Sequence, residues 1–388
     1  MVTFQNRQEA LDQICDPTEQ NILLNIYGEA GIGKSRLLHE AAQRLRTQNP
    51  PASVLYVDLK PQVANAENQG EAVVRALVAQ SQGRLNVAWQ SAEYAAGQVV
   101  AQLTEWIKFT PVVLMFDTTE VLQREMEFWR WMEVNLVGPL AVEGQVRQIS
   151  AGRIPVPWRR IEVRRVVQLL FLEPLSPQEA ILALACEVLQ QHNNHLDGAE
   201  LEQAIDLVLE FSFGHPQLSE ELGRFVASHW SGTTIEEFKS ELPKQSVRPF
   251  VEKHFFEAIE SPWDKILWWA GVLEWFDATI LQRYLTRVAP ELVKGQPDYF
   301  FIQGLNRLRI RNTVVWREER GDRLHGVIGD ILRHCFKVTD GEGYRRACLG
   351  AAEMFENLAL ELGEAPEAEQ YRWEAESYRR RAKQEGEE

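Results

Sequence analysis

The sequence predicts an α/β protein in which a parallel sheet, covered by helices on both faces, is followed by helical domains. In the first part of the chain, short apolar runs alternate with helix-length segments, which is typical of parallel strands joined by crossover helices. After "LEPLSPQEA" (172–180) the strand patterns stop and helical periodicity follows. A glycine-rich turn between the first run and the first helix marks one edge of the predicted sheet.

Five short, mostly apolar runs are the predicted strands. They are 21–27, 53–59, 111–117, 146–152 and 164–172. Between the first two, the segment 34–48 has helical periodicity and places five small or apolar residues on one face: Leu37, Leu38, Ala41, Ala42 and Leu45.

The helical part begins after the last strand. Ser176 has the features of a helix N-cap, with Pro177 at the first helical position and Glu179 at the third. Helices are predicted over 177–229, whereas 228–246 has the polar and helix-breaking content of a connection.

Residues 262–337 have an order of elements that predicts a winged helix. Three helical stretches, near 263–275, 279–288 and 298–308, precede a β-hairpin that turns at "EERGD". A further helix is predicted over 327–336.

The tail, 343–384, holds two charged amphipathic helices broken at "GEAP". A single helical hairpin resembles one repeat of a solenoid and cannot bury its own apolar face. We therefore expect it to pack on the winged helix or on a partner.

Size and composition fit a protein of several domains located in the cytoplasm, with no membrane contact. The chain has 388 residues, with 45% hydrophobic and 25% charged content. Its start, "MVTFQNRQEA", lacks the order of a signal peptide, and runs such as "VVQLLFL" are too short to span a bilayer. The cysteines are scattered without a CxxC motif, which predicts reduced thiols: Cys15, Cys186, Cys335 and Cys348.

The turn "GEAGIGKS" (28–35) fits the phosphate-binding pattern GxxxxGK[ST]. It follows a predicted strand and opens a predicted helix, which is the context that the motif requires. Its backbone N–H groups and the helix dipole favour phosphate oxygens, Lys34 can reach the β- and γ-phosphates, and Ser35 can ligate Mg²⁺. The predicted nucleotide-binding residues here are Gly28, Glu29, Ala30, Gly31, Ile32, Gly33, Lys34, Ser35 and Arg36.

A second anchor lies at the end of the third predicted strand. "VVLMFD" delivers Asp117 to the carboxyl end of a buried strand, which is the edge where open α/β sheets bind ligands. A carboxylate at this point can hold Mg²⁺ through its water shell, whereas the alternative is an aspartate that only begins a turn. These elements predict a P-loop nucleotide-binding domain (1–174), a helical lid (175–245), a winged-helix domain (246–340) and a C-terminal helical hairpin (341–388).

With these residues in place, the chain resembles the signal-transduction ATPases with numerous domains, the STAND class of AAA+ relatives. "GEAGIGKSRLL" looks like the P-loop of that class, and "FQNRQEAL" (4–11) is similar to its N-terminal segment along the adenine, with Asn6 for glycine and Gln8 for glutamate. "LMFDTTE" resembles the Walker B strand, although Thr118 stands where many members have a second acid. The resemblance implies that Glu120 is the residue that polarises the attacking water; it also fits an acid in a helix first turn.

The resemblance also implies three residues that sense the nucleotide. "QISAGR" places Arg153 after the fourth strand, where the class senses the γ-phosphate. "FGHPQL" is similar to the Gly-x-Pro segment, in which Pro216 lies near the adenine, and "RLHG" resembles the Met-His-Asp motif, in which His325 contacts the β-phosphate of ADP. Each also has an ordinary interpretation: a surface arginine, a proline at a helix start and a structural histidine.

Two other patterns have less support. Arg307, Arg309 and Arg311 in "NRLRIR" could meet DNA phosphates, but the net charge of -15 and the acids interleaved in the wing argue against nucleic acid as a partner. "HNNH" (192–195) has HxxH spacing, but no third ligand is near it, so no metal site is predicted there.

Together, these patterns predict an ATP/ADP switch of the STAND type with Mg²⁺ and slow hydrolysis. Domain closure would depend on the nucleotide, and so would formation of a homo-oligomer. Its output would lie in a protein partner or a separate effector chain. The alternatives are a DNA-binding AAA+ ATPase of the origin-recognition or transcription-regulator kind, and a scaffold that holds a nucleotide without turnover.

Overall fold

The structure is a computed structural model that describes most of the chain. The described residues are 7–16, 23–122, 125–142, 146–176, 180–192, 196, 198–230, 234–257, 259–297, 299–311, 315–318 and 320–384, of which residue 180 and residues 310–318 are described by their backbone alone. The predicted helix start at Pro177 and Glu179 lies outside them, as does Asn6. The described residues divide into two compact units, one ending at Glu173 and one beginning at Pro174.

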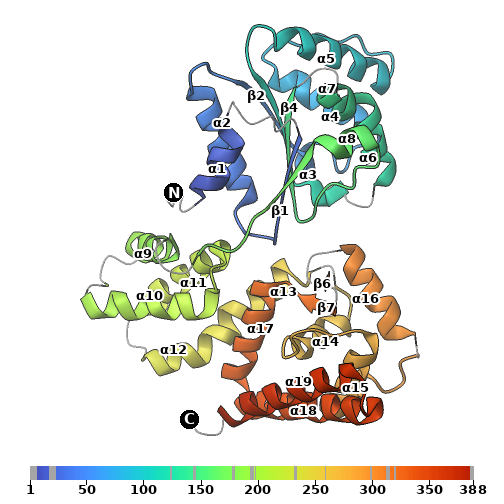
Figure 1. Cartoon of the computed structure of the whole chain (residues 1–388). Helices are drawn as coiled ribbons and strands as arrows, with labels where there is room; N and C mark the ends of the chain where they lie inside the picture. The colour runs from blue at the N-terminus through green and yellow to red at the C-terminus, as the bar shows by residue number, and fades with distance from the viewer. Residues whose placement is uncertain are drawn as a thin grey trace. The chain divides into compact units, whose positions relative to one another are not determined.

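The first unit contains a five-stranded parallel sheet with the strand order β2-β3-β4-β1-β5 (Figure 1). The five predicted strands and their parallel arrangement are therefore confirmed. The strands are β1 (Leu23–Tyr27), β2 (Ser53–Asp58), β3 (Val112–Asp117), β4 (Arg147–Gly152) and β5 (Val167–Phe171).

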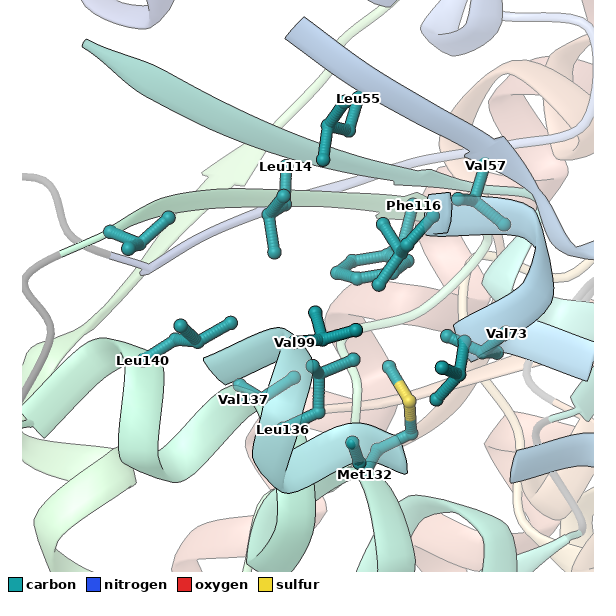
Figure 2. Packing of buried hydrophobic residues seen from close by; sticks show 14 of the residues in the cluster. Leu55, Val57, Val73, Val99, Leu114, Phe116, Met132, Leu136, Val137 and Leu140 are labelled. Carbon is teal, nitrogen blue, oxygen red and sulfur yellow. The ribbon is translucent and has the colours of Figure 1, made fainter. Parts of the chain in front are cut away.

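Helices cover both faces of this sheet. On one face, α1 and α2 pack against the strands, and the five predicted apolar residues of α2 are all buried there. On the other face, helices α4 to α7 enclose a larger core; Figure 2 shows Leu114 and Phe116 of β3 opposite Val99 of α5 and Met132 of α6. The helices of this unit are α1 (Gln8–Cys15), α2 (Lys34–Thr47), α3 (Leu59–Gln62), α4 (Gln69–Gln80), α5 (Ala92–Trp106), η1 (Thr119–Leu122), α6 (Met126–Met132), η2 (Glu133–Val137), α7 (Gly138–Val142) and α8 (Ile161–Val166).

The described residues of the second unit are helical except for one hairpin and the connecting turns. Three helices form its first part. From α14 to α17 the elements have the order of a winged helix, as predicted: three helices, an antiparallel hairpin and a further helix. Its elements are α9 (Ala180–His192), α10 (Gly198–Ser212), α11 (Pro216–His229), α12 (Ile235–Leu242), η3 (Pro243–Val247), α13 (Arg248–His254), α14 (Trp263–Ala270), α15 (Ala278–Val288), η4 (Pro290–Leu292), α16 (Phe300–Arg311), β6 (Val315–Glu318), β7 (Gly321–Leu324), α17 (Gly326–Thr339), α18 (Gly341–Leu362) and α19 (Pro366–Gln384).

The predicted connection over 228–246 is wrong, because α12 and η3 occupy most of it. Thr234 and Glu237 form a capping box, in which each side chain accepts from the backbone N–H of the other residue. Phe238 and Leu242, four residues apart, are buried on one face of the helix. The polar content of this segment therefore caps and solvates a helix rather than breaking one.

The C-terminal hairpin, α18 and α19, packs on the winged helix, which was one of the two expected arrangements. The Tyr378 hydroxyl accepts from the backbone N–H of Glu274 at 2.8 Å, and the Trp275 indole donates to Glu374 at 3.0 Å. Phe355 of α18 stacks on Tyr378 in the same buried layer. Among the described residues of the whole chain, no helix combines the length and apolar content needed to cross a membrane.

Candidate nucleotide-binding site

The predicted P-loop connects the end of β1 to the start of α2, which begins at Lys34. Gly31 (φ +74°) and Gly33 (φ +99°) lie in the left-handed region, where a residue with a side chain would be strained. At Gly28 the reason for glycine is space, since a Cβ atom there would lie 2.7 Å from the carbonyl oxygen of Leu172. The glycines of the motif therefore let the backbone curl tightly between the sheet and the helix.

Lys34 is buried at the base of this loop, with 8% of its surface exposed. Its ammonium group donates to the carbonyl oxygens of Gly28 at 2.8 Å and Glu29 at 2.6 Å. Burial lowers the pKa of Lys34 to about 8, although the carboxylates of Glu120 and Asp117 act in the opposite direction. The lysine is thus held inside the loop, close enough to both predicted carboxylates to be affected by their charge.

Asp117 ends β3 and is buried. One carboxylate oxygen accepts from the backbone N–H of Thr118 at 2.8 Å, and the other accepts from the Tyr56 hydroxyl at 2.6 Å. Tyr56 is on β2, which pairs with β3 in a register that places Asp58 beside Asp117. Burial and the hydrogen bond to Asp117 hold the pKa of Tyr56 well above its ordinary value, so the hydroxyl stays a donor.

Tyr56 is a residue that the sequence did not single out, and it links Asp117 to α2. Its hydroxyl lies 3.5 Å from Nδ1 of His39, whose ring packs against the tyrosine ring at 4.6 Å. The same His39 nitrogen lies 2.7 Å from the carbonyl oxygen of Ser35. Asp117 is therefore linked through Tyr56 and His39 to the backbone of Ser35, the other predicted magnesium ligand.

We expect Tyr56→Phe to weaken Mg²⁺-dependent ATP binding by about 3- to 10-fold, because one hydrogen bond that orients Asp117 is lost. Titration of ATP with and without Mg²⁺, followed by calorimetry, measures this. Tyr94→Phe, an exposed tyrosine at the start of α5, is the control. Equal Mg²⁺-dependent affinities for the parent and Tyr56→Phe would show that Asp117 needs no support from β2.

Glu120 lies in η1, directly after β3, and faces Arg153, which follows β4. The guanidinium Nε of Arg153 is 3.6 Å from Glu120 Oε1, and the second carboxylate oxygen of Glu120 is buried without a hydrogen-bond partner. A Cβ at Gly152 would lie 1.9 Å from the Thr119 hydroxyl, so glycine at the end of β4 lets η1 approach. The pairing with Arg153 favours a role for Glu120 in the site. The alternative, an acid that only stabilises the first turn of a helix, is less favoured because η1 is only four residues long.

Thr118, which departs from the Walker B pattern that this segment resembles, has an unusual backbone conformation and its own hydrogen bond. Its φ is +61°, a strained value for a β-branched residue, and its hydroxyl donates to Asp58 at 2.9 Å. The left-handed turn separates the direction of Asp117 from that of Glu120, so the chain can present the two carboxylates to different parts of the site.

Arg7 ties the N-terminal segment to the loop. Its guanidinium group donates to the carbonyl oxygen of Ile32 in the P-loop at 3.2 Å and also to that of Glu173. Burial lowers the pKa of Arg7 to about 10, although Glu173 raises it. The segment predicted to lie along the adenine thus contacts the phosphate loop through the arginine of its motif.

The affinity for ATP should fall as the pH rises through about 8. The charged form of Lys34 binds phosphate, and its pKa in the protein alone is about 8. Between pH 7 and pH 9 the charged fraction drops about tenfold, and the affinity should drop with it. Titrations at both pH values measure this, with Lys34→Ala as the control that lacks the slope. A parental affinity that does not change with pH would contradict the assignment.

The other two predicted nucleotide contacts lie in the second unit. Pro216 is the first residue of α11, where the His215 ring accepts from the backbone N–H of Leu218 at 3.1 Å and caps the helix. His325 is buried and immediately precedes α17. Pro216 therefore has a local structural role at a helix start, and the contacts of both residues with a nucleotide stay predictions.

A glycine-rich loop between a buried strand and a helix, with an acid ending the next strand but one in a five-stranded parallel sheet, defines an α/β P-loop NTPase fold. The chain is similar in structure to the Walker-type ATPase PABY2304 of Pyrococcus abyssi, at 14% sequence identity and a TM-score of 0.58, covering 85% of this chain and 96% of that one.

Two further solved structures overlap less well. One is the Aeropyrum pernix ORC2 protein in its ADP form, at 15% identity and a TM-score of 0.48, covering 88% of this chain and 95% of that one. The other is the replication initiator DnaA bound to AMPPCP and single-stranded DNA, at 14% identity and a TM-score of 0.40, covering 79% of this chain and 89% of that one. No family model matches the chain, and no curated protein matches its sequence. The similarity to the Pyrococcus protein supports the P-loop ATPase fold, whereas the resemblance to the STAND class in particular receives no support from the comparisons.

Proposed function

We propose that this chain binds ATP and ADP at the P-loop and hydrolyses ATP slowly. The observation that carries the proposal is the electrostatic grouping of Lys34 with Asp117, Glu120 and Arg153 at one edge of the sheet. The residues are of the types that phosphoryl transfer requires: a lysine and an arginine for phosphate oxygens, one carboxylate for a metal and one for water. The similar Pyrococcus protein is described as a Walker-type ATPase, which agrees with this.

Mg²⁺ fits the donor set at this point, since a serine hydroxyl and an aspartate carboxylate are the hard oxygen ligands that it prefers. Ser35 is exposed in the first turn of α2, and each oxygen of Asp117 accepts one hydrogen bond, which leaves a lone pair on each. When bound, Mg²⁺ would neutralise charge that develops on the phosphates.

The remaining residues act on the phosphates and on water. Lys34 would exchange its two carbonyl acceptors in the loop for phosphate oxygens. Arg153 would pair with the γ-phosphate, and Glu120, no longer held by Arg153, would orient the attacking water. Because Arg153 would pair with either Glu120 or the γ-phosphate, binding of the γ-phosphate would release Glu120 to act on water.

Identification of the nucleotide that co-purifies with the protein, followed by calorimetric titration with ATP, ADP and GTP, tests the proposal directly. We expect adenine nucleotides to bind, with measurable release of phosphate from ATP in the presence of Mg²⁺. A purified, folded protein that binds no nucleotide at millimolar concentration would contradict it.

A second candidate function is DNA binding by the winged helix, and the expectation that nucleic acid is not a partner has no support. Arg307 on α16 and Arg320 in the turn of the wing are exposed, so both can reach phosphates. Arg309 cannot, because it forms a two-fold contact with the fully buried Asp322, and this pairing raises its pKa.

Fluorescence anisotropy with a labelled duplex, at two salt concentrations and with ATP or ADP, measures DNA binding. If the winged helix binds DNA, Arg307→Glu should weaken the interaction at low salt, whereas Arg287→Glu, on α15, should change it less. Binding that is absent at low salt, or equally weakened by both changes, would rule out this use of α16.

The narrower proposal, a STAND-type switch that closes on ADP and opens with ATP, rests on Arg153, Pro216 and His325 alone. It would give a nucleotide-dependent change in mass by light scattering, without DNA, and faster release of a fluorescent ADP in His325→Ala. A His325→Ala protein that only melts at a lower temperature would assign that histidine to the core.

A further inference from the structure

A pocket of about 310 Å³ lies in the second unit, among its described residues, and belongs to no predicted site. Its lining comes from three places: Phe213, in the turn between α10 and α11, then α17, and the hairpin α18–α19. In Figure 1, α17 runs down to the hairpin. The volume is at the small end of the range of ligand pockets, about 300–1,000 Å³.

The lining is rich in positively charged groups. Arg333 and Lys337 on α17 and Arg381 on α19 all contribute to it, with His334 beside them, whereas Asp330 is the one acid that lines the described pocket. Among the described residues, the lining therefore carries three full positive charges and one acid. A concave surface of one sign attracts ligands of the opposite sign.

The acids near the pocket do not use all the donors of the two arginines. Arg333 contacts Asp330 at 2.9 Å and Glu274 at 3.8 Å, and Arg381 donates to the same Glu274. Burial raises the pKa of Glu274, but Arg333 and Arg381 outweigh this effect and hold the pKa below its ordinary value. Even so, Arg333 Nε and Arg381 Nη1 are buried without a hydrogen-bond partner.

Buried donors without an acceptor are uncommon in folded proteins. Here, two of them belong to neighbouring guanidinium groups on the lining of one pocket. Planar guanidinium forks match the geometry of phosphate and carboxylate groups. An anionic group in the pocket would accept hydrogen bonds from the guanidinium groups that line it.

Part of the lining is aromatic. Phe213 has 36% of its surface exposed, and Tyr344 of α18 also lines the pocket. The His334 ring packs edge-on against Phe213 at 5.6 Å and Phe211 at 4.7 Å. An occupant could therefore combine an apolar or planar body, packed on the aromatic residues, with a charged group bound by the arginines.

We propose that this pocket binds a small organic anion, with a phosphate or carboxylate group on Arg333, Lys337 and Arg381 and a planar or apolar body against Phe213 and Tyr344. Such a ligand would contact the α10–α11 turn, the winged helix and the C-terminal hairpin at the same time. It would act as an effector that stiffens the second unit, and the site does not depend on nucleotide binding at the P-loop.

Phenyl phosphate and benzoate are suitable probes, with phenol as the neutral comparison. Binding is measured by saturation-transfer NMR and calorimetry on the full chain carrying Lys34→Ala, so that the P-loop does not contribute. We expect at least one of the two anions to bind and phenol not to bind. Which anion binds more tightly then distinguishes a phosphate ligand from a carboxylate ligand.

Arg381→Gln and Lys337→Gln should each weaken binding of the anion by about tenfold or more, since each removes a charged contact. The matched control is Arg380→Gln, an exposed arginine of the same helix, which should leave the affinity unchanged. Because Arg381 also pairs with Glu274, Lys337→Gln is the variant that tests the pocket without that ion pair. The proposal is overturned if neither anion binds at millimolar concentration, or if Lys337→Gln and Arg380→Gln bind equally.

Discussion

Lys34→Ala should weaken the binding of ATP to this chain by about 100-fold or more. The ammonium group would make charge-assisted contacts with at least two phosphate oxygens, and two contacts at ~1.5 kcal/mol each correspond to more than 100-fold in affinity. Its position supports this expectation, because the side chain is already buried within the loop and no large movement is needed. Calorimetric titration with ATP and Mg²⁺ measures the change.

The control for this experiment is Lys108→Ala. Lys108 is an exposed lysine beyond the end of α5 that pairs with its neighbour Glu105 on the surface, so its loss should leave the affinity unchanged. Circular dichroism of Lys34→Ala shows whether the loop change has disturbed the fold. A folded Lys34→Ala protein with parental affinity would mean that the glycine-rich turn is not a phosphate site.

Glu120→Gln should leave ATP binding nearly unchanged and slow hydrolysis by about 100-fold or more. A glutamine cannot accept the proton of the attacking water, and a positioned general base contributes roughly 10²–10⁴-fold to a rate. Because the amide is neutral, its attraction to Arg153 also weakens, so the arginine is more available to the γ-phosphate. The variant should accumulate in the ATP-bound form, as measured by single-turnover phosphate release and by the nucleotide retained after gel filtration.

Glu127→Gln, a neighbouring exposed acid in α6, provides the matched control and should hydrolyse ATP at the parental rate. If Glu120→Gln also turns over at that rate, the water must be positioned by Thr118 or by a residue outside η1. The same experiment therefore distinguishes a catalytic carboxylate from one that only pairs with Arg153.

The sequence was sufficient for the sheet and the phosphate loop because both depend on local patterns. Strand-length apolar runs must be buried, and a left-handed turn such as that at Gly31 requires glycine. The winged helix could be predicted for the same reason, since each of its elements has its own periodicity and a glycine, Gly321, begins the second strand of the hairpin, where it pairs with Glu318.

The support around Asp117 could not be predicted from the sequence, because it depends on strand order. Tyr56 is near the end of β2, and only the pairing of β2 with β3 brings its hydroxyl to Asp117. In the sequence these residues are 61 positions apart, and Tyr56 is an ordinary strand residue. Arg309 is a similar case. It lies in a run of arginines that suggested a DNA contact, but its guanidinium group donates to the buried Asp322 of the hairpin.

The wrong prediction of a connection at α12 has a different cause, because the sequence does contain a helix-start signal there. Thr234 and Glu237 have the spacing of a capping box, a helix-start signal that prevails over the polar and helix-breaking content of the segment. Propensity is a weak guide over short segments, and here the burial of Phe238 determines the helix.

The attachment of the C-terminal hairpin has a practical meaning for anyone who shortens this protein. A truncated chain that stops at residue 340 would uncover the side of α15 on which α18 lies, where Val288 fits so closely that a Cβ at Gly350 would be only 2.4 Å from it. It would also leave the Trp275 indole without its acceptor and the ring of Tyr284 open to water. Such a fragment should aggregate during purification, so boundaries for crystallisation or fusion belong after Gln384 rather than before Gly341.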